Sequence, residues 1–132
     1  MQEPSIFTRI IEKEIPANII FEDDRVIAFL TTHPLSEGHT LVVPKKQVEQ
    51  IWDLDKDDYE YLWDTAKKIA IHLRLVMEVD KVGVVVKGFE VPHTHIHLIP
   101  VNQHSGVNFD PEPSPPEEDN DILAAIAERV RI

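Results

Sequence analysis

Histidine alternates with other residues over positions 93–97, which read His-Thr-His-Ile-His and continue into Leu-Ile-Pro. Because successive side chains of a β-strand point to opposite faces, this alternation predicts a strand over residues 94–99 with the imidazoles of His93, His95 and His97 on one face. The other face of this predicted strand carries the apolar residues Ile96 and Leu98 and needs a core to cover it. Imidazole acts near neutral pH as nucleophile, proton carrier or metal ligand, so this strand is the first candidate for a functional site.

The rest of the chain groups its helices and strands instead of alternating them. Apolar residues at helical spacing predict helices over residues 5–12, 55–77 and 117–130. Short apolar runs predict strands over residues 17–22, 26–30, 40–43, 82–86 and 94–99. Grouping of this kind is typical of an α+β fold. We therefore expect a mostly antiparallel five-stranded sheet with one long helix, a short N-terminal helix and a C-terminal helix.

Length and composition narrow the class of protein. The 132 residues predict a single domain over 1–132, in which residues 101–117, with four prolines, form an irregular proline-rich arm before the C-terminal helix. The chain has no cysteine, which excludes disulfides and thiolate zinc sites. The N-terminus does not resemble a secretory signal and no run approaches the roughly 18 apolar residues of a membrane span, so we expect a cytoplasmic protein without membrane contact.

The net charge of −11 argues against nucleic acid as a partner, but it leaves room for a small anionic ligand that local donors would bind. Three interpretations of the histidines then remain. They can be structural residues on a half-exposed strand. Two of them can bind a metal, although the outer pair on a straight strand lies about 13 Å apart, at about 3.3 Å per residue. They can also meet an extended phosphate, with one imidazole attacking phosphorus and its neighbours donating hydrogen bonds.

The same residues resemble a known family. His93-Thr94-His95-Ile96-His97-Leu98-Ile99 has the form His-x-His-x-His followed by two apolar residues, the motif of the histidine triad (HIT) family. Segments at 5–16, 21–24 and 38–45 also resemble that family, so the similarity runs from about residue 5 to residue 100. The chain is similar to a small member of the Hint-like branch.

The resemblance implies a nucleotidyl hydrolase or transferase that works without a metal or other cofactor. His95 would be the nucleophile, His97 would bind the phosphate oxygens, and His93 would hold the His95 ring through its backbone carbonyl. A purine nucleotide or nucleoside phosphoramidate would bind near residues 6–30, where Phe7, Ile27 and Phe29 are candidate contacts. The family further implies a homodimer whose two sheets join. Alternatives are a dinucleoside polyphosphate hydrolase and a nucleotide-binding regulatory protein with little turnover.

The chain also departs from the family pattern. Some relatives bind a structural zinc, but the matching positions here are Ser5, Thr8 and Gln47, so no metal site is expected. Thr31 stands where relatives carry an acid for the ribose, and its hydroxyl is a weaker acceptor. Phe89 and Glu90 replace the pair that faces the leaving group in relatives.

Three polar side chains near the motif keep two interpretations each. Glu90 can protonate a leaving amine or be a solvated loop acid. Lys87 can contact the phosphate or be an ordinary surface lysine. His39, at the start of a predicted strand, matches a family landmark, and we expect it to be structural.

Overall fold

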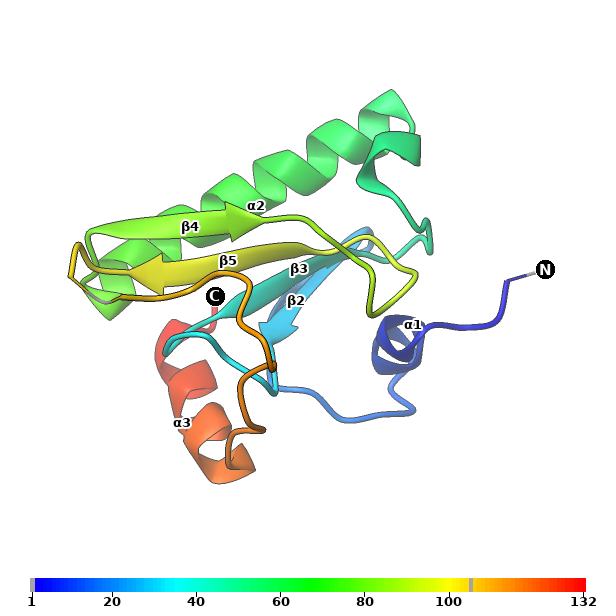
Figure 1. The fold of residues 1–132 in the computed structure, drawn as a ribbon. Coiled ribbons are helices and arrows are strands. Elements are labelled where there is room, and N and C mark those ends of the chain that lie inside the picture. Colours follow the sequence, from blue (N-terminus) through cyan, green and yellow to red (C-terminus); the bar gives the residue numbers. More distant parts are fainter. Residues whose placement is uncertain (1, 105) are drawn as a thin grey trace.

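The computed structural model describes residues 2–104 and 106–132 (Figure 1). Its elements are α1 (Ile6–Ile11), β1 (Ile19–Glu22), β2 (Val26–Leu30), β3 (Thr40–Pro44), a short 3-10 helix (Ile51–Asp53), α2 (Lys56–Met77), β4 (Lys81–Val85), β5 (Ile96–Val101) and α3 (Asn120–Val130). The strands form one antiparallel sheet in the order β1-β2-β3-β5-β4. This confirms the α+β fold and the five-stranded sheet expected from the sequence.

Strand β2 separates two apolar clusters, because its side chains alternate between the faces of the sheet. Val26, Ala28 and Leu30 join the main core, which α2 and α3 cover. Ile27 and Phe29 point the other way and pack against Phe7 and Ile10 of α1, and against Leu41 and Val43 of β3. The helices α2 and α3 thus lie on one face of the sheet and α1 on the other.

Helix α2 has clear signals at both ends. Asp55 is its N-cap, and its carboxylate accepts a hydrogen bond from the backbone N–H of Asp58. Glu78, in the left-handed conformation, ends it, and its N–H bonds the carbonyl of Arg74. Between these ends, residues at helical spacing are buried against the sheet, namely Leu62, Ala66, Ile69 and Leu73. These apolar contacts supply the cover that the predicted strands require.

The ends of several elements differ from those expected, and three of these differences concern the surroundings of the motif and the C-terminal segment. Strand β5 begins at Ile96 and not at residue 94, because both the N–H and the hydroxyl of Thr94 bond the carbonyl of Val48, at 2.7 Å each, outside the sheet. Helix α3 begins at Asn120 and not at residue 117. The N–H of Glu118 is bonded to the carbonyl of Thr32 at 2.8 Å, so the chain there follows the β2–β3 loop. Strand β4 is shifted by one residue, to Lys81–Val85.

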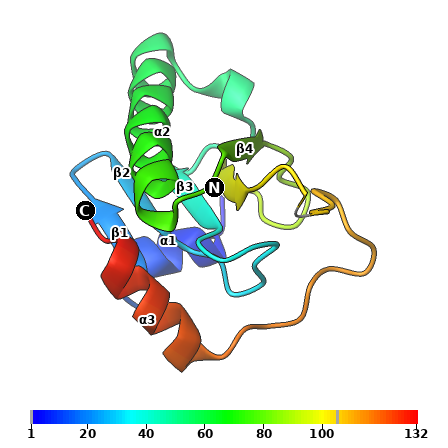
Figure 2. The ribbon, with the colours of Figure 1, turned by 90° about the vertical axis from the view of Figure 1, so that its left-hand side faces the viewer.

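The segment between β5 and α3, residues 102–119 except Ser105, contains no helix or strand, and we call it the arm. Figure 2 shows the arm on the side of the sheet opposite α2. Near its start, Asn102 accepts a hydrogen bond from the N–H of Asp80, and near its end the carbonyl of Pro115 accepts one from the ring of His33. Within the described residues, no helix is long and apolar enough to cross a membrane.

Candidate active site

The rings of the three motif histidines lie side by side, since Phe7 packs against both His93 and His95 and His95 packs against His97, but only His97 lies within β5. His93 lies in a bend before β5, is fully buried, and has both ring nitrogens bonded inside the protein. Its Nε2 donates to the carbonyl of Pro44 at 2.8 Å, which leaves Nδ1 to accept from the hydroxyl of Ser5 at 2.7 Å. The His93 side chain therefore has no ring nitrogen free for a ligand.

A hydrogen-bonded cluster holds His93 from the side of α1. The hydroxyl of Thr8 donates to Oε1 of Gln47 at 2.6 Å, and the N–H of Ser5 donates to the same oxygen at 2.9 Å. These are the positions that carry zinc ligands in some relatives. Two hydroxyls, an amide and an imidazole whose Nδ1 is already bonded are a poor donor set for zinc. The described residues also contain no group of three or more His, Cys, Asp or Glu side chains that could hold a metal.

His95 has a ring orientation suited to nucleophilic attack. Its Nδ1 lies 2.7 Å from the backbone carbonyl of His93, and because a carbonyl only accepts, Nδ1 carries the proton. Burial lowers the pKa of the ring, so it is neutral near pH 7 and Nε2 keeps its lone pair. The ring of Phe7 packs edge-on against it, with centroids 4.9 Å apart. The lone pair of His95 is thus held in place by a backbone bond and an aromatic contact.

His97 is the opposite tautomer, and His39 sets it. The backbone N–H of Leu35 donates to Nδ1 of His39 at 3.0 Å, so His39 carries its proton on Nε2. That Nε2 lies 3.0 Å from Nδ1 of His97, which must accept, so His97 carries its own proton on Nε2. Burial is the main cause that lowers the pKa of His39 to about 3 and that of His97 to about 4, so both rings are neutral near pH 7.

Together, His95 and His97 offer a nucleophile beside a hydrogen-bond donor. Their ring centroids are 5.0 Å apart and the planes are inclined at 63°. The two rings have opposite tautomers, with a lone pair on Nε2 of His95 and an N–H on Nε2 of His97. A tetrahedral oxyanion placed over both would meet an attacking nitrogen and a donor to one of its oxygens. Sequence reasoning missed the part that His39 plays in this, although it recognised His39 as a family landmark.

The predicted nucleoside contacts lie beside the histidines on the same face of the sheet. Phe7 and Phe29 pack with ring centroids 5.6 Å apart, and both belong to the cluster under α1. Ile27 is completely buried beneath them, so it can shape a ligand site only from below. Thr31 follows β2, where its hydroxyl accepts from the N–H of His33 at 3.2 Å.

The predicted residues before the motif lie in the β4–β5 loop. Lys87 forms an ion pair with Asp110 of the arm at 2.5 Å, a partner that the sequence did not indicate. The positive charge of Lys87 helps to lower the pKa of His97, and the carboxylate of Glu90 opposes the lowered pKa of His95 and of His97. Phe89 is 88% exposed. The loop thus brings the charges of Lys87 and Glu90 to the two catalytic candidates, while the Phe89 ring points into solvent.

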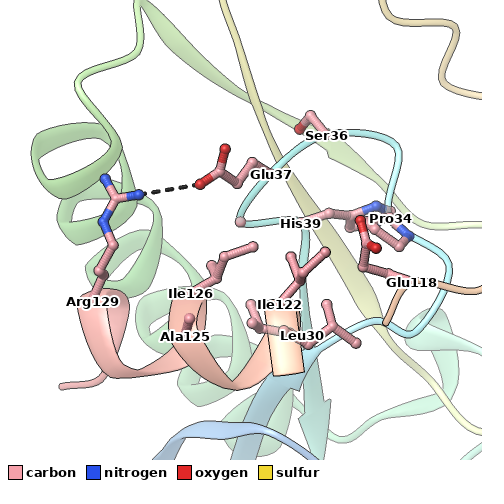
Figure 3. Close-up of a pocket in the computed structure, with 12 residues that line it drawn as sticks. Leu30, Pro34, Ser36, Glu37, His39, Glu118, Ile122, Ala125, Ile126 and Arg129 are labelled. Carbon is pink, nitrogen blue, oxygen red and sulfur yellow. Dashed lines mark hydrogen bonds and ion pairs between the residues drawn. The ribbon is translucent and has the colours of Figure 1, made fainter. Parts of the chain in front are cut away.

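A separate cavity of about 470 Å³ lies between the β2–β3 loop and α3 (Figure 3). Leu30, Ile122 and Ile126 supply apolar surface, and the ion pair between Glu37 and Arg129, at 3.1 Å, lies at its edge. His39 lines this cavity as well as contacting His97. None of the predicted site residues borders it.

Comparisons with known proteins agree with the motif. The family model described as "HIT domain" matches residues 12–104. An uncharacterized HIT-like protein of Borreliella burgdorferi is 38% identical over 111 residues, covering 79% of this chain and 80% of the relative. The crystal structure of a HIT-like protein involved in cell-cycle regulation from Bartonella henselae has a TM-score of 0.87 at 29% identity, covering 99% of this chain and 97% of the other. A HIT family hydrolase from Legionella pneumophila has a TM-score of 0.64 at 28% identity, covering 76% and 96%.

Proposed function

This chain belongs to the histidine triad (HIT) family, and we propose that it is a hydrolase or transferase acting at the α-phosphate of a nucleoside phosphoramidate or nucleoside monophosphate ester. The observation that carries the proposal is the pair of opposite tautomers on His95 and His97. A metal-free site of this kind needs both a nucleophile and a neutral donor beside it. The similarity to the Legionella protein, a HIT family hydrolase, supports the same reaction class.

In the first step, the lone pair on Nε2 of His95 attacks phosphorus, and the bond from phosphorus to the leaving group breaks. The Nε2–H of His97 donates to a phosphate oxygen, where negative charge builds up in the transition state. The leaving amine takes up a proton, whose delivery we assign to Glu90, the acid of the β4–β5 loop that precedes the motif. The product is a nucleotidyl group on His95.

In the second step, water attacks phosphorus and the bond to Nε2 of His95 breaks. The proton of the water passes to Glu90, which restores the acid for the next turnover. The nucleoside monophosphate leaves, and His95 regains its lone pair. Throughout both steps, the carbonyl of His93 keeps the proton of His95 on Nδ1, so the ring has one reactive nitrogen only.

The purine nucleoside would bind on the α1 side of the histidines. Phe7 contacts His95 and Phe29 contacts Phe7, and because both rings are buried they would support the base from below, while Thr31 offers a hydroxyl at the end of β2. We assign the cytoplasm as the compartment, in keeping with a chain that has no cysteine.

We also propose a homodimer joined along β4. This strand is at an edge of the sheet and exposes Val84, while α2 exposes Leu75. An unpaired strand edge beside exposed apolar side chains is a surface that a second copy of the chain can cover. Sedimentation equilibrium tests this arrangement: the mass should be twice that of the chain, and a monomer at all concentrations would contradict it.

Turnover of adenosine 5′-phosphoramidate tests the reaction, with AMP release as the readout. Wild-type protein should release AMP, His95→Ala should abolish release, and the matched control His72→Gln should retain it. His72 lies on α2, on the face of the sheet opposite α1, and its ring donates to the carbonyl of Val130. Binding of AMP without turnover in the wild type would favour a regulatory nucleotide-binding protein and would overturn the proposed hydrolysis.

A further inference from the structure

The arm contacts the same face of the sheet that carries His97. In the pairing of β4 with β5, Val85 lies opposite His97 and Gly83 lies opposite Ile99. Side chains two residues apart in a strand share a face, so Gly83 is on the His97 face, about 7 Å along the strand from Val85. The ring of Phe109 lies directly on Gly83, where an added Cβ would come within 2.3 Å of Cε2. This close approach requires glycine at position 83.

The next residue of the arm brings a negative charge to the same place. Asp110 pairs with Lys87 at 2.5 Å, and Glu90 and Glu112 also lie close enough to act on the ammonium of Lys87. The carboxylate of Asp110 therefore offsets the charge of Lys87. Lys87 is two residues beyond Val85, the residue that lies opposite His97, so its pairing with Asp110 leaves no net positive charge from this pair beside the reaction site.

The position of the arm relative to α1 decides which part of a substrate would meet these groups. Phe7 and Phe29 lie on the β2 side of His95, while Gly83, Lys87 and the arm lie on the β4 side. If the nucleoside occupies the α1 side, as the proposed function requires, the leaving group must point toward Phe109 and Asp110. A polyphosphate there would bring several negative charges against the carboxylates, whereas an amine would bring none.

We propose that Phe109 and Asp110 select the leaving group, by excluding polyphosphate and second-nucleotide leaving groups and admitting amines. Asp110 does so in two ways, because its carboxylate repels an anion directly and also occupies Lys87, the cation that would otherwise attract it. Phe109 covers Gly83 and so limits the space on the face of the sheet that carries His97. The inference rests on the proposed function for the side on which the nucleoside binds.

Two measurements on wild type, Asp110→Asn and Phe109→Ala test this selection. Calorimetry gives the dissociation constants of AMP and ATP, and kinetics give kcat/KM for adenosine phosphoramidate and for diadenosine tetraphosphate. Wild type should bind AMP about tenfold more tightly than ATP. Asp110→Asn should reduce this preference by about three- to tenfold, with a smaller effect at high salt because the charges are then screened. Phe109→Ala should raise relative kcat/KM for the dinucleotide.

The control is Asp64→Asn, which removes the same charge from an exposed position on α2, on the other side of the sheet. It should leave both ratios unchanged. One contrary result is that the wild type turns over the phosphoramidate while Asp110→Asn keeps the wild-type ratio of AMP to ATP affinity and the wild-type ratio of the two kcat/KM values. This result would overturn the inference but not the proposed function. Absence of both nucleotide binding and turnover in the wild type would overturn the proposed function, and this inference with it.

Discussion

His39 donates from Nε2 to Nδ1 of His97 across 3.0 Å, and this bond decides that the proton of His97 lies on Nε2. Removing it lets the His97 ring take either tautomer, so a part of the molecules would present a lone pair to the phosphate. We therefore expect His39→Ala to lower kcat by about 100-fold with a small change in KM, because the lost donor acts in the transition state. Steady-state kinetics with adenosine phosphoramidate measure both constants. A kcat equal to that of the wild type would show that His39 is structural only.

The buried histidines should make stability depend on pH between 6.5 and 5. Burial lowers the pKa of His39 to about 3 and that of His97 to about 4, from 6.5 in the unfolded chain. Between these values the unfolded state binds more protons, so stability is full above pH 6.5 and falls as the pH drops toward the folded pKa values. Each ring contributes up to about 1.4 kcal/mol per pH unit.

Urea unfolding at pH 7.5, 6 and 5 measures this dependence. Asp58 and the other carboxylates with lowered pKa values titrate below pH 5. Changes in stability between pH 7.5 and 5 therefore come mainly from histidines. His39→Gln should reduce the dependence of the free energy of unfolding on pH by the contribution of about one histidine, whatever its effect on stability at pH 7.5. An unchanged slope in that variant would contradict the assignment of a buried neutral His39.

Ser5→Ala should destabilise the protein by about 1 to 3 kcal/mol, because it leaves the buried Nδ1 of His93 without its donor. The same hydroxyl accepts from the N–H of Thr8 and caps α1, so both effects have the same sign. Chemical denaturation measures the loss. The control is Ser114→Ala at an exposed position of the arm, which should change stability by less than about 0.5 kcal/mol. Equal stabilities of the two variants would contradict the role assigned to the cluster.

Glu90→Gln should slow the reaction according to the leaving group. Alkylamine leaving groups need a proton and should lose about 100-fold in kcat/KM, whereas a fluoride leaving group needs none and should lose little. Comparing adenosine alkyl phosphoramidates with adenosine 5′-phosphorofluoridate in one variant provides its own control. A uniform loss across both substrates would assign Glu90 to substrate binding instead of proton transfer.

The sequence predicted the parts of the fold that depend on local patterning. Strand β2 was placed at its observed limits because its apolar run is bounded by Asp23-Asp24-Arg25 on one side and a polar turn on the other. Helix α2 was placed within one residue, since its cap and its apolar face are both local. Helix α3 was not, because the bond from Glu118 to Thr32 that delays its start joins distant parts of the chain.

The same limit applies to the site. The alternation at 93–97 identified the histidines, but their different orientations come from partners far away in sequence. Ser5, which binds His93, is 88 residues from it, and His39 is 58 residues from His97. The pairing of Lys87 with Asp110 had no sequence signal either, because a single acid in a proline-rich segment is indistinguishable from other surface acids.

Nucleotidylation of His95 is the step on which the proposed function depends. To detect it, the enzyme is mixed with excess adenosine phosphoramidate and quenched in base within one turnover, and the intact protein is weighed, because a phosphoramidate bond to histidine survives base and is lost in acid. We predict one added adenylyl group, mapped by peptide sequencing to His95, lost on acid treatment and absent in His95→Ala. AMP release that persists in His95→Ala, with no adduct at any time in the wild type, would show that the reaction does not pass through His95.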